Sequence, residues 1–126
     1  MNITYLMEDD RTIRLCDVSG DILSIREDPE KNTVLLTLTG TLRNDVAGYL
    51  QDELEAILSL GMTAMVDLSG VVYMSSAAQQ VFLQIQQKID GTGRGGLRLI
   101  HPTDAVYAEL KQTGISELLN VERGKD

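Results

Sequence analysis

The sequence has little of what most catalytic and metal sites are built from. It contains one cysteine, Cys16, so no intrachain disulfide and no cysteine-based metal site can form. Its one histidine, His101, is distant from Cys16 along the chain, and neither residue lies in a motif that pairs a nucleophile with a base. We therefore expect a chain that is not an enzyme, with no catalytic residue, metal site or cofactor.

Long apolar runs, basic clusters and aromatic residues are also scarce. No apolar run approaches the roughly 18 residues that span a bilayer, and residues 1–10 lack the basic start and apolar stretch of a signal peptide. The 11 basic residues are scattered among 19 acidic ones, giving a net charge of −8 that repels phosphate backbones. One phenylalanine and no tryptophan leave little to stack on bases. We expect a cytoplasmic protein that binds neither nucleic acid nor membranes.

Apolar periodicity predicts an alternation of strands and helices within one domain of 126 residues. Residues 12–16 and 21–27 alternate around a turn signal, as in a hairpin. Residues 62–68 are almost continuously apolar, which predicts a strand buried on both faces. The remaining expected elements are strands at 34–42 and 97–100 and helices at 43–60, 76–89 and 103–112. This order predicts an α/β domain in which helices cover one face of a mixed sheet.

The most informative segment covers residues 66–82, where a strand leads through a short connection to Ser75 and Ser76 and then to apolar residues at helical spacing. One of the two serines can be the N-cap, whose hydroxyl accepts a backbone N–H. A phosphate on Ser76 would meet the positive end of the helix dipole and add a charge of about −2. The residues alone leave both interpretations open, a cap only or a phosphorylation site. The glutamines of this helix are expected to face water or a partner: Gln79, Gln80, Gln84, Gln86 and Gln87.

The same segment resembles the STAS domain of anti-sigma factor antagonists. That family has an aromatic-Met/Ile-Asp-Ser-Ser/Thr-Gly-Leu-Gly pattern after a hydrophobic strand, and this chain has Tyr73-Met74-Ser75-Ser76 there. It departs from the pattern with Ser75 at the Asp position, Ala77 at the second hydroxyl, and Gln79-Gln80 in place of Leu-Gly. The resemblance extends over residues 34–121, including the family's second strand at 34–42, its Gly-Gly strand at 95–100 and its last helix at 101–115.

The resemblance implies a STAS-like single domain with a four- to five-stranded mixed sheet and helices packed on one face. We expect this domain at residues 19–126, preceded by an N-terminal extension at residues 1–18. The extension could be an extra edge strand, a dimer arm or a tail.

The resemblance also implies a function. The family members bind an anti-sigma factor serine kinase when unphosphorylated, and phosphorylation of the serine matched here by Ser76 releases them. ATP belongs to the kinase, a separate phosphatase would remove the phosphate, and the antagonist would be a monomer or homodimer. The resemblance places the partner-binding residues at two segments: Thr41, Leu42, Arg43, Ser75, Ser76, Ala77, Gln79 and Gln80.

Two other functions remain open from the sequence. The chain could be a STAS subunit of a larger signalling assembly or transport system, in which Ser76 is never phosphorylated. It could also be a small-ligand-binding or enzymatic α/β domain of another class.

Overall fold

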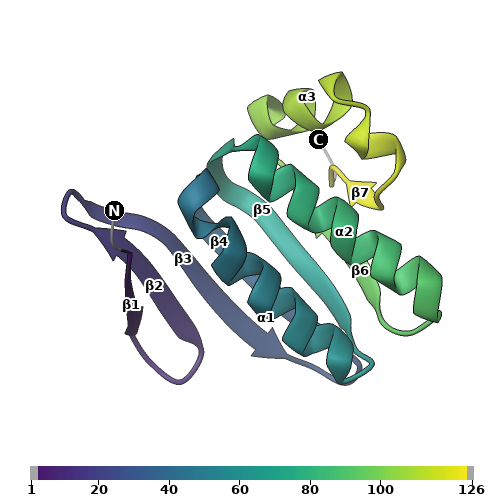
Figure 1. Ribbon diagram of the computed structural model, residues 1–126, viewed down its shortest axis with the longest axis horizontal. Coiled ribbons are helices and arrows are strands. Elements are labelled where there is room, and N and C mark those ends of the chain that lie inside the picture. Colours follow the sequence, from purple (N-terminus) through teal and green to yellow (C-terminus); the bar gives the residue numbers. More distant parts are fainter. Residues whose placement is uncertain (1–2, 125–126) are drawn as a thin grey trace.

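A computed structural model describes residues 3–124, whose seven strands form one sheet in the order of the sequence (Figure 1). The strands are β1 (Thr4–Met7), β2 (Thr12–Asp17), β3 (Gly20–Pro29), β4 (Thr33–Leu42), β5 (Thr63–Met74), β6 (Gly96–Ile100) and β7 (Val121–Glu122). The helices are α1 (Ala47–Ser59), α2 (Ser76–Thr92) and α3 (Asp104–Gln112), with 3₁₀ turns η1 (Asn44–Val46) and η2 (Ile115–Glu117).

The sheet is mixed, as predicted, but it has more strands than predicted. Strands β1 to β4 are antiparallel neighbours, and β4 to β7 are parallel. The expectation of four to five strands is wrong because β1 and β2 extend one edge and β7 adds a two-residue strand at the other. Of the 1–18 segment, residues 4–7 form the edge strand and residues 12–17 form the strand next to it, and Met1 and Asn2 lie outside the described residues.

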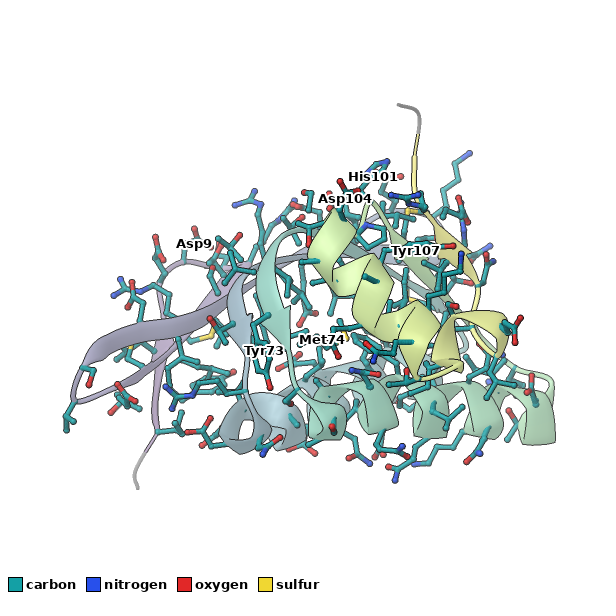
Figure 2. All side chains as sticks on the ribbon, turned by 90° about the horizontal axis from the view of Figure 1, so that it is seen from above. Asp9, Tyr73, Met74, His101, Asp104 and Tyr107 are labelled. Carbon is teal, nitrogen blue, oxygen red and sulfur yellow. The ribbon has the colours of Figure 1, made fainter. Side chains whose placement is uncertain are left out.

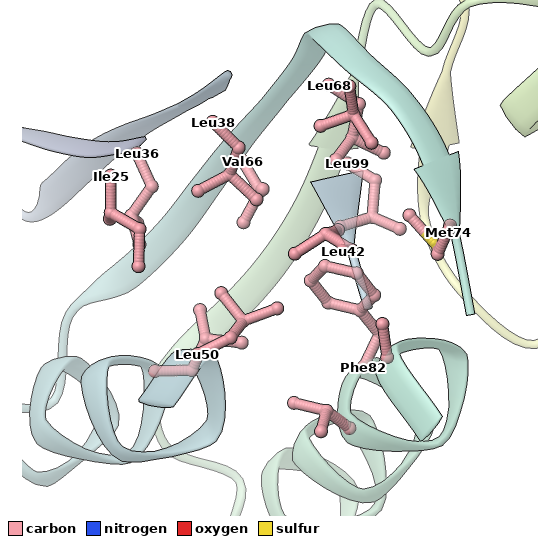
Figure 3. Packing of buried hydrophobic residues seen from close by; sticks show 14 of the residues in the cluster. Ile25, Leu36, Leu38, Leu42, Leu50, Val66, Leu68, Met74, Phe82 and Leu99 are labelled. Carbon is pink, nitrogen blue, oxygen red and sulfur yellow. The ribbon is translucent and has the colours of Figure 1, made fainter. Parts of the chain in front are cut away.

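Helices α1 and α2 lie side by side on one face of the sheet, and α3 lies at the carboxyl end of β5 (Figure 1). Phe82 of α2 packs among Leu42, Met74 and Leu99, all at most 1% exposed (Figure 3). The hydroxyl of Thr103, the N-cap of α3, donates to the carbonyl oxygen of Val71 at 3.5 Å and so joins α3 to β5. One core therefore contains buried residues of all three helices together with those of the central strands.

Strand β5 differs from its prediction in two ways. Ala64, Val66 and Leu68 are buried on the helix side, but Met65 and Asp67 between them are only half-buried. The prediction of a strand buried on both faces is therefore wrong: the second face of β5 lacks a covering helix within the described residues. The strand also continues to Met74, so only Ser75 connects it to α2. The predicted connection after residue 68 is absent because those residues pair with the end of β4.

The antiparallel half of the sheet leaves a hollow of about 560 Å³ beside α1. The ring centroids of Tyr5 of β1 and Tyr49 of α1 are 6.2 Å apart along this hollow. Glu27 of β3 and Glu53 of α1 also line it. Burial, followed by the interaction with the neighbouring carboxyl of Glu53, raises the pKa of Glu27 from 4.5 to about 8.

Candidate functional site

The two predicted partner-binding segments meet at the carboxyl ends of β4 and β5. Leu42 and Met74 are paired residues of these parallel strands. Directly after them, the backbone N–H of Ser75 donates to the carbonyl oxygen of Leu42 at 2.8 Å. In α/β folds, binding sites lie outside the carboxyl ends of parallel strands, because the chain turns there into exposed loops and helix starts. Residues 41–43 and 75–80 therefore share one end of the sheet.

The two serines have different roles at the start of α2. Ser75 is the N-cap: it is 4% exposed, and its hydroxyl accepts the backbone N–H of Ala78 at 3.2 Å. Ser76 is the first residue of the helix and is exposed. None of the hydrogen bonds among residues 3–124 uses the Ser76 hydroxyl. The cap function therefore falls to Ser75 and leaves the hydroxyl of Ser76 open to solvent.

Gln79 and Leu42 lie inside the molecule rather than at its surface. Gln79 is 2% exposed, and its side-chain oxygen accepts a hydrogen bond from the hydroxyl of Thr113 at 2.9 Å. The prediction that Gln79 faces water or a partner is therefore wrong, since its amide joins α2 to the end of α3. Leu42 is fully buried, so it supports the site from below. Gln80 is exposed as predicted, and Ala77 is half-buried.

Arg43 is held by carboxylates on both sides. Its guanidinium donates to Asp45 from Nε at 3.0 Å and to Asp17 at the end of β2 from Nη2 at 3.1 Å. The hydrogen bond from Arg43 holds the pKa of Asp45 below its usual value. The pKa of Asp17 is also lowered. The hydrogen bond from the backbone N–H of Ser19 makes the largest contribution, and the hydrogen bond from the Arg43 side chain adds to it. Both carboxylates are thus charged at neutral pH, and they take up hydrogen-bond donors of the guanidinium.

The last predicted site residue, Thr41, is half-buried and pairs with Tyr73 of β5.

Sequence reasoning missed two apolar side chains beside this site. Val72 and Tyr73 are 71% and 53% exposed, although they belong to β5. Figure 2 shows Tyr73 and Met74 near the carboxyl end of β5, with α3 beside the strand. A hollow of about 130 Å³ separates them from α3, lined by Val72, Tyr73, Met74, Ala105, Val106 and Glu109. The apolar residues after Gly70 could have predicted them, because apolar residues in a connection between two elements either pack into the core or remain exposed on the surface. We call Val72, Tyr73, Ser76 and Gln80 the site surface.

The titratable groups away from the site surface include the thiol of the one cysteine, Cys16. The thiol of Cys16 donates to Asp21 at 3.1 Å, and this hydrogen bond raises the pKa of Cys16, which keeps the thiol protonated. Within residues 3–124, no three of His, Cys, Asp and Glu gather as metal ligands would. In the same part of the chain, no helix is both long enough and apolar enough to cross a membrane.

The fold and the site together define a small mixed α/β domain whose candidate site is an open surface at the carboxyl ends of β4 and β5. A family model described as "Mlab, STAS domain" matches residues 25–120. The chain therefore belongs to the STAS domain family. No curated protein sequence matches it.

Several solved structures share this fold. An anti-sigma factor antagonist from Mycobacterium paratuberculosis has a TM-score of 0.73 at 14% identity, covering 87% of this chain and 92% of its own. The anti-sigma factor antagonist SpoIIAA in its unphosphorylated form has a TM-score of 0.65 at 14% identity, covering 77% and 86%. A serine-to-glutamate variant of RsbS from Moorella thermoacetica has a TM-score of 0.64 at 14% identity, covering 80% and 87%. At such identities the likeness shows the fold.

Proposed function

We propose that this protein is an anti-sigma factor antagonist that binds an anti-sigma factor serine kinase when unphosphorylated and is released by phosphorylation of Ser76. The observation that carries the proposal is the exposed hydroxyl of Ser76 at the start of α2, a few residues after the exposed Val72 and Tyr73 of β5. The same fold in structures of anti-sigma factor antagonists supports it.

The chemistry of the switch requires only a hydroxyl from this chain. The Oγ atom of Ser76 attacks the γ-phosphorus of ATP held by the kinase, the hydroxyl proton passes to a base of the kinase, and ADP leaves. The catalytic groups and the nucleotide belong to the kinase, so we assign no enzymatic step and no cofactor to this chain. A separate phosphatase would hydrolyse the phosphoserine. Both partners and the antagonist would meet in the cytoplasm.

The charges around the site favour release after phosphorylation. A phosphate adds a charge of about −2 to the site surface. Arg43, the cation of the neighbouring strand end, already donates to Asp17 and Asp45. Desolvating an unmatched dianion in an interface costs several kcal/mol, and about 1.4 kcal/mol changes affinity tenfold. The complex should therefore dissociate when Ser76 is phosphorylated.

The docking surface that we propose differs from the one expected from the sequence. Val72 and Tyr73 join it because large exposed apolar side chains next to a polar rim are typical of interface centres. Ser76, Gln80 and half-buried Thr41 and Ala77 complete it, because they lie on the two segments that meet at this end of the sheet.

The first experiment is intact-mass analysis after incubation with candidate anti-sigma kinases and ATP. We expect one phosphate on the wild type and on Ser75→Ala, and none on Ser76→Ala. In a binding assay, Ser76→Asp should weaken the complex at least tenfold, whereas the neutral isostere Ser76→Asn should bind within about threefold of the wild type. A Ser76→Asp variant that binds as tightly as the wild type would overturn the proposal.

The second candidate is a STAS subunit of a larger signalling assembly or transport system. Strands β1 and β2 favour it, because they extend the sheet away from the site surface and place its edge at β1. Stable high-order assemblies that require residues 1–18, together with no phosphate transfer from any kinase, would support this function over the first.

A further inference from the structure

The two edges of the sheet are protected to different degrees. Strand β7 has two residues, and very short edge strands are one way in which proteins avoid edge-to-edge association. Strand β1 has four exposed residues, Thr-Tyr-Leu-Met, without a charge or a proline. Its register with β2 runs without a bulge from Thr4 to Met7. Among the described residues, the edge formed by β1 thus lacks three of the features that protect sheet edges, namely a charge, a proline and a bulge.

The backbone groups that face outward from β1 can be assigned from its pairing with β2. The N–H of Glu8 donates to the carbonyl oxygen of Thr12 at 2.8 Å, so residue 8 faces β2. Hydrogen-bonding direction alternates along an antiparallel strand, so Leu6 and Thr4 also face β2. The N–H and C=O groups of Tyr5 and Met7 consequently point to the free edge.

The side chains of β1 are apolar on both faces of the sheet. Tyr5 and Met7 are 46% and 59% exposed on the helix side, opposite Leu15 and Ile13 of β2. Leu6 is 44% exposed on the other side, opposite Arg14. A strand added to this edge would therefore meet apolar side chains above and below its own plane.

We propose that β1 pairs antiparallel with β1 of a second copy, across a two-fold axis that is perpendicular to the sheet and passes midway between the two copies of Leu6. Tyr5 then lies opposite the partner's Met7, and these two residues exchange the hydrogen bonds of their outward backbone groups. Leu6 lies opposite the partner's Leu6 as a non-hydrogen-bonded pair, in which side chains approach most closely.

This register suits a second copy because the strand is complementary to itself. Apolar side chains meet apolar ones at all three central positions, as an isologous interface requires. Glu8 falls opposite the partner's Thr4, so the acidic residues 8–10 of the two copies lie at opposite ends of the contact. A four-residue strand pair buries less than the roughly 1,200 Å² typical of stable complexes. The dimer is therefore weak and dependent on concentration, and both site surfaces stay outside it.

The proposal is tested first by sedimentation of the full chain across a range of concentrations. The mass should rise from 13.9 kDa towards twice that value. Met7→Pro removes an outward N–H while leaving the pairing with β2 intact, and it should shift the association at least tenfold to higher concentration. Met7→Thr, which keeps the N–H, should shift it by less than threefold. A wild type that stays at the monomer mass throughout, or equal effects of the two variants, would overturn the pairing.

The register is tested by cross-linking in a Cys16→Ser background. The Cα atoms of a non-hydrogen-bonded pair are about 4.5 Å apart, so Leu6→Cys should form an intermolecular disulfide under mild oxidation. Thr4→Cys is the matched control: its counterpart in the partner lies four residues along the strand, about 14 Å away, and should not cross-link. Equal cross-linking of both variants, or none at Leu6→Cys, would refute this register. Circular dichroism of each variant establishes that it is folded.

Discussion

Replacing Glu27 by glutamine should stabilise this protein at neutral pH. Glu27 lies half-buried in the hollow beside α1, where its carboxyl meets that of Glu53, and Tyr5 also faces this pair. The cations near this part of β3 are used elsewhere, since Arg11 and Arg26 both bind Asp28 at 3.0 Å. Among the described residues, no ion pair involves Glu27. The wild type must therefore either keep Glu27 protonated or hold an unfavourable charge.

The sign of the effect follows from the raised pKa of Glu27. Between pH 4.5, its ordinary pKa, and about 8, its folded pKa, the folded protein binds more protons at this site than the unfolded chain. The free energy of unfolding therefore falls as the pH rises through this interval. If this carboxyl were fully buried, the free energy of unfolding would be lower by about 3 kcal/mol at pH 7 than at low pH. Because Glu27 is only half-buried, water screens the effect, and we expect about 1–2 kcal/mol.

The assay is urea denaturation of the wild type and Glu27→Gln at pH 4.5 and pH 7. Glutamine keeps the size and can still donate to Glu53, but it carries no charge. The variant should exceed the wild type by about 1–2 kcal/mol at pH 7, and the difference should vanish near pH 4.5. Glu30→Gln, in the exposed turn after β3, is the control and should change stability little at either pH. A variant that is less stable at pH 7, or a gain that is independent of pH, would refute the reasoning.

Three further substitutions test the packing that positions the site. Ser75→Ala removes the N-cap of α2 and should cost about 1 kcal/mol in urea denaturation, whereas Ser76→Ala should cost less than about 0.5 kcal/mol; equal losses would contradict the assignment of the cap. Gly40→Ala places a Cβ atom near the carbonyl oxygen of Ile22 at a φ of +121°, so we expect a loss above about 2 kcal/mol, measured as a lower urea midpoint with unchanged slope. Phe82→Ala empties the centre of the core and should cost about 3–5 kcal/mol by the same method; a loss below about 1 kcal/mol would show that the core collapses around the gap.

Much of the fold follows from local patterns in the sequence. The hairpin of β2 and β3, the three helices and the parallel strands after β4 follow apolar periodicity and glycine positions. Gly61 and Gly114, for example, end α1 and α3 at positive φ, as their positions after the last apolar residues predict. The sequence left residues 1–18 open as an edge strand, a dimer arm or a tail, because the four residues of β1 carry too short an alternation. The full length of β5 depends on pairing with residues 39–42, which a local pattern does not show.

The candidate site was predictable in position but not in detail. A hydroxyl pair before a helical pattern locates Ser76, and the alternation of strands and helices brings residues 41–43 to the same end of the sheet. The burial of Gln79 could not be predicted, because the hydroxyl that satisfies its amide comes from Thr113, 34 residues further along the chain. The pairing of Arg43 with Asp17 escaped prediction for the same reason, since it connects residues 26 apart in sequence.

The bond between Arg43 and Asp17 has a practical consequence for how this protein is studied. Trimming the chain to a minimal domain by deleting residues 1–18 would remove one of the two carboxylates that neutralise this guanidinium. The shortened protein would then present a more positive end of the sheet next to α2, where a phosphate or an acidic partner could dock. Binding measured on such a truncated protein would differ from binding to the full chain at this end of the sheet, because Arg43 would keep only Asp45 as its partner.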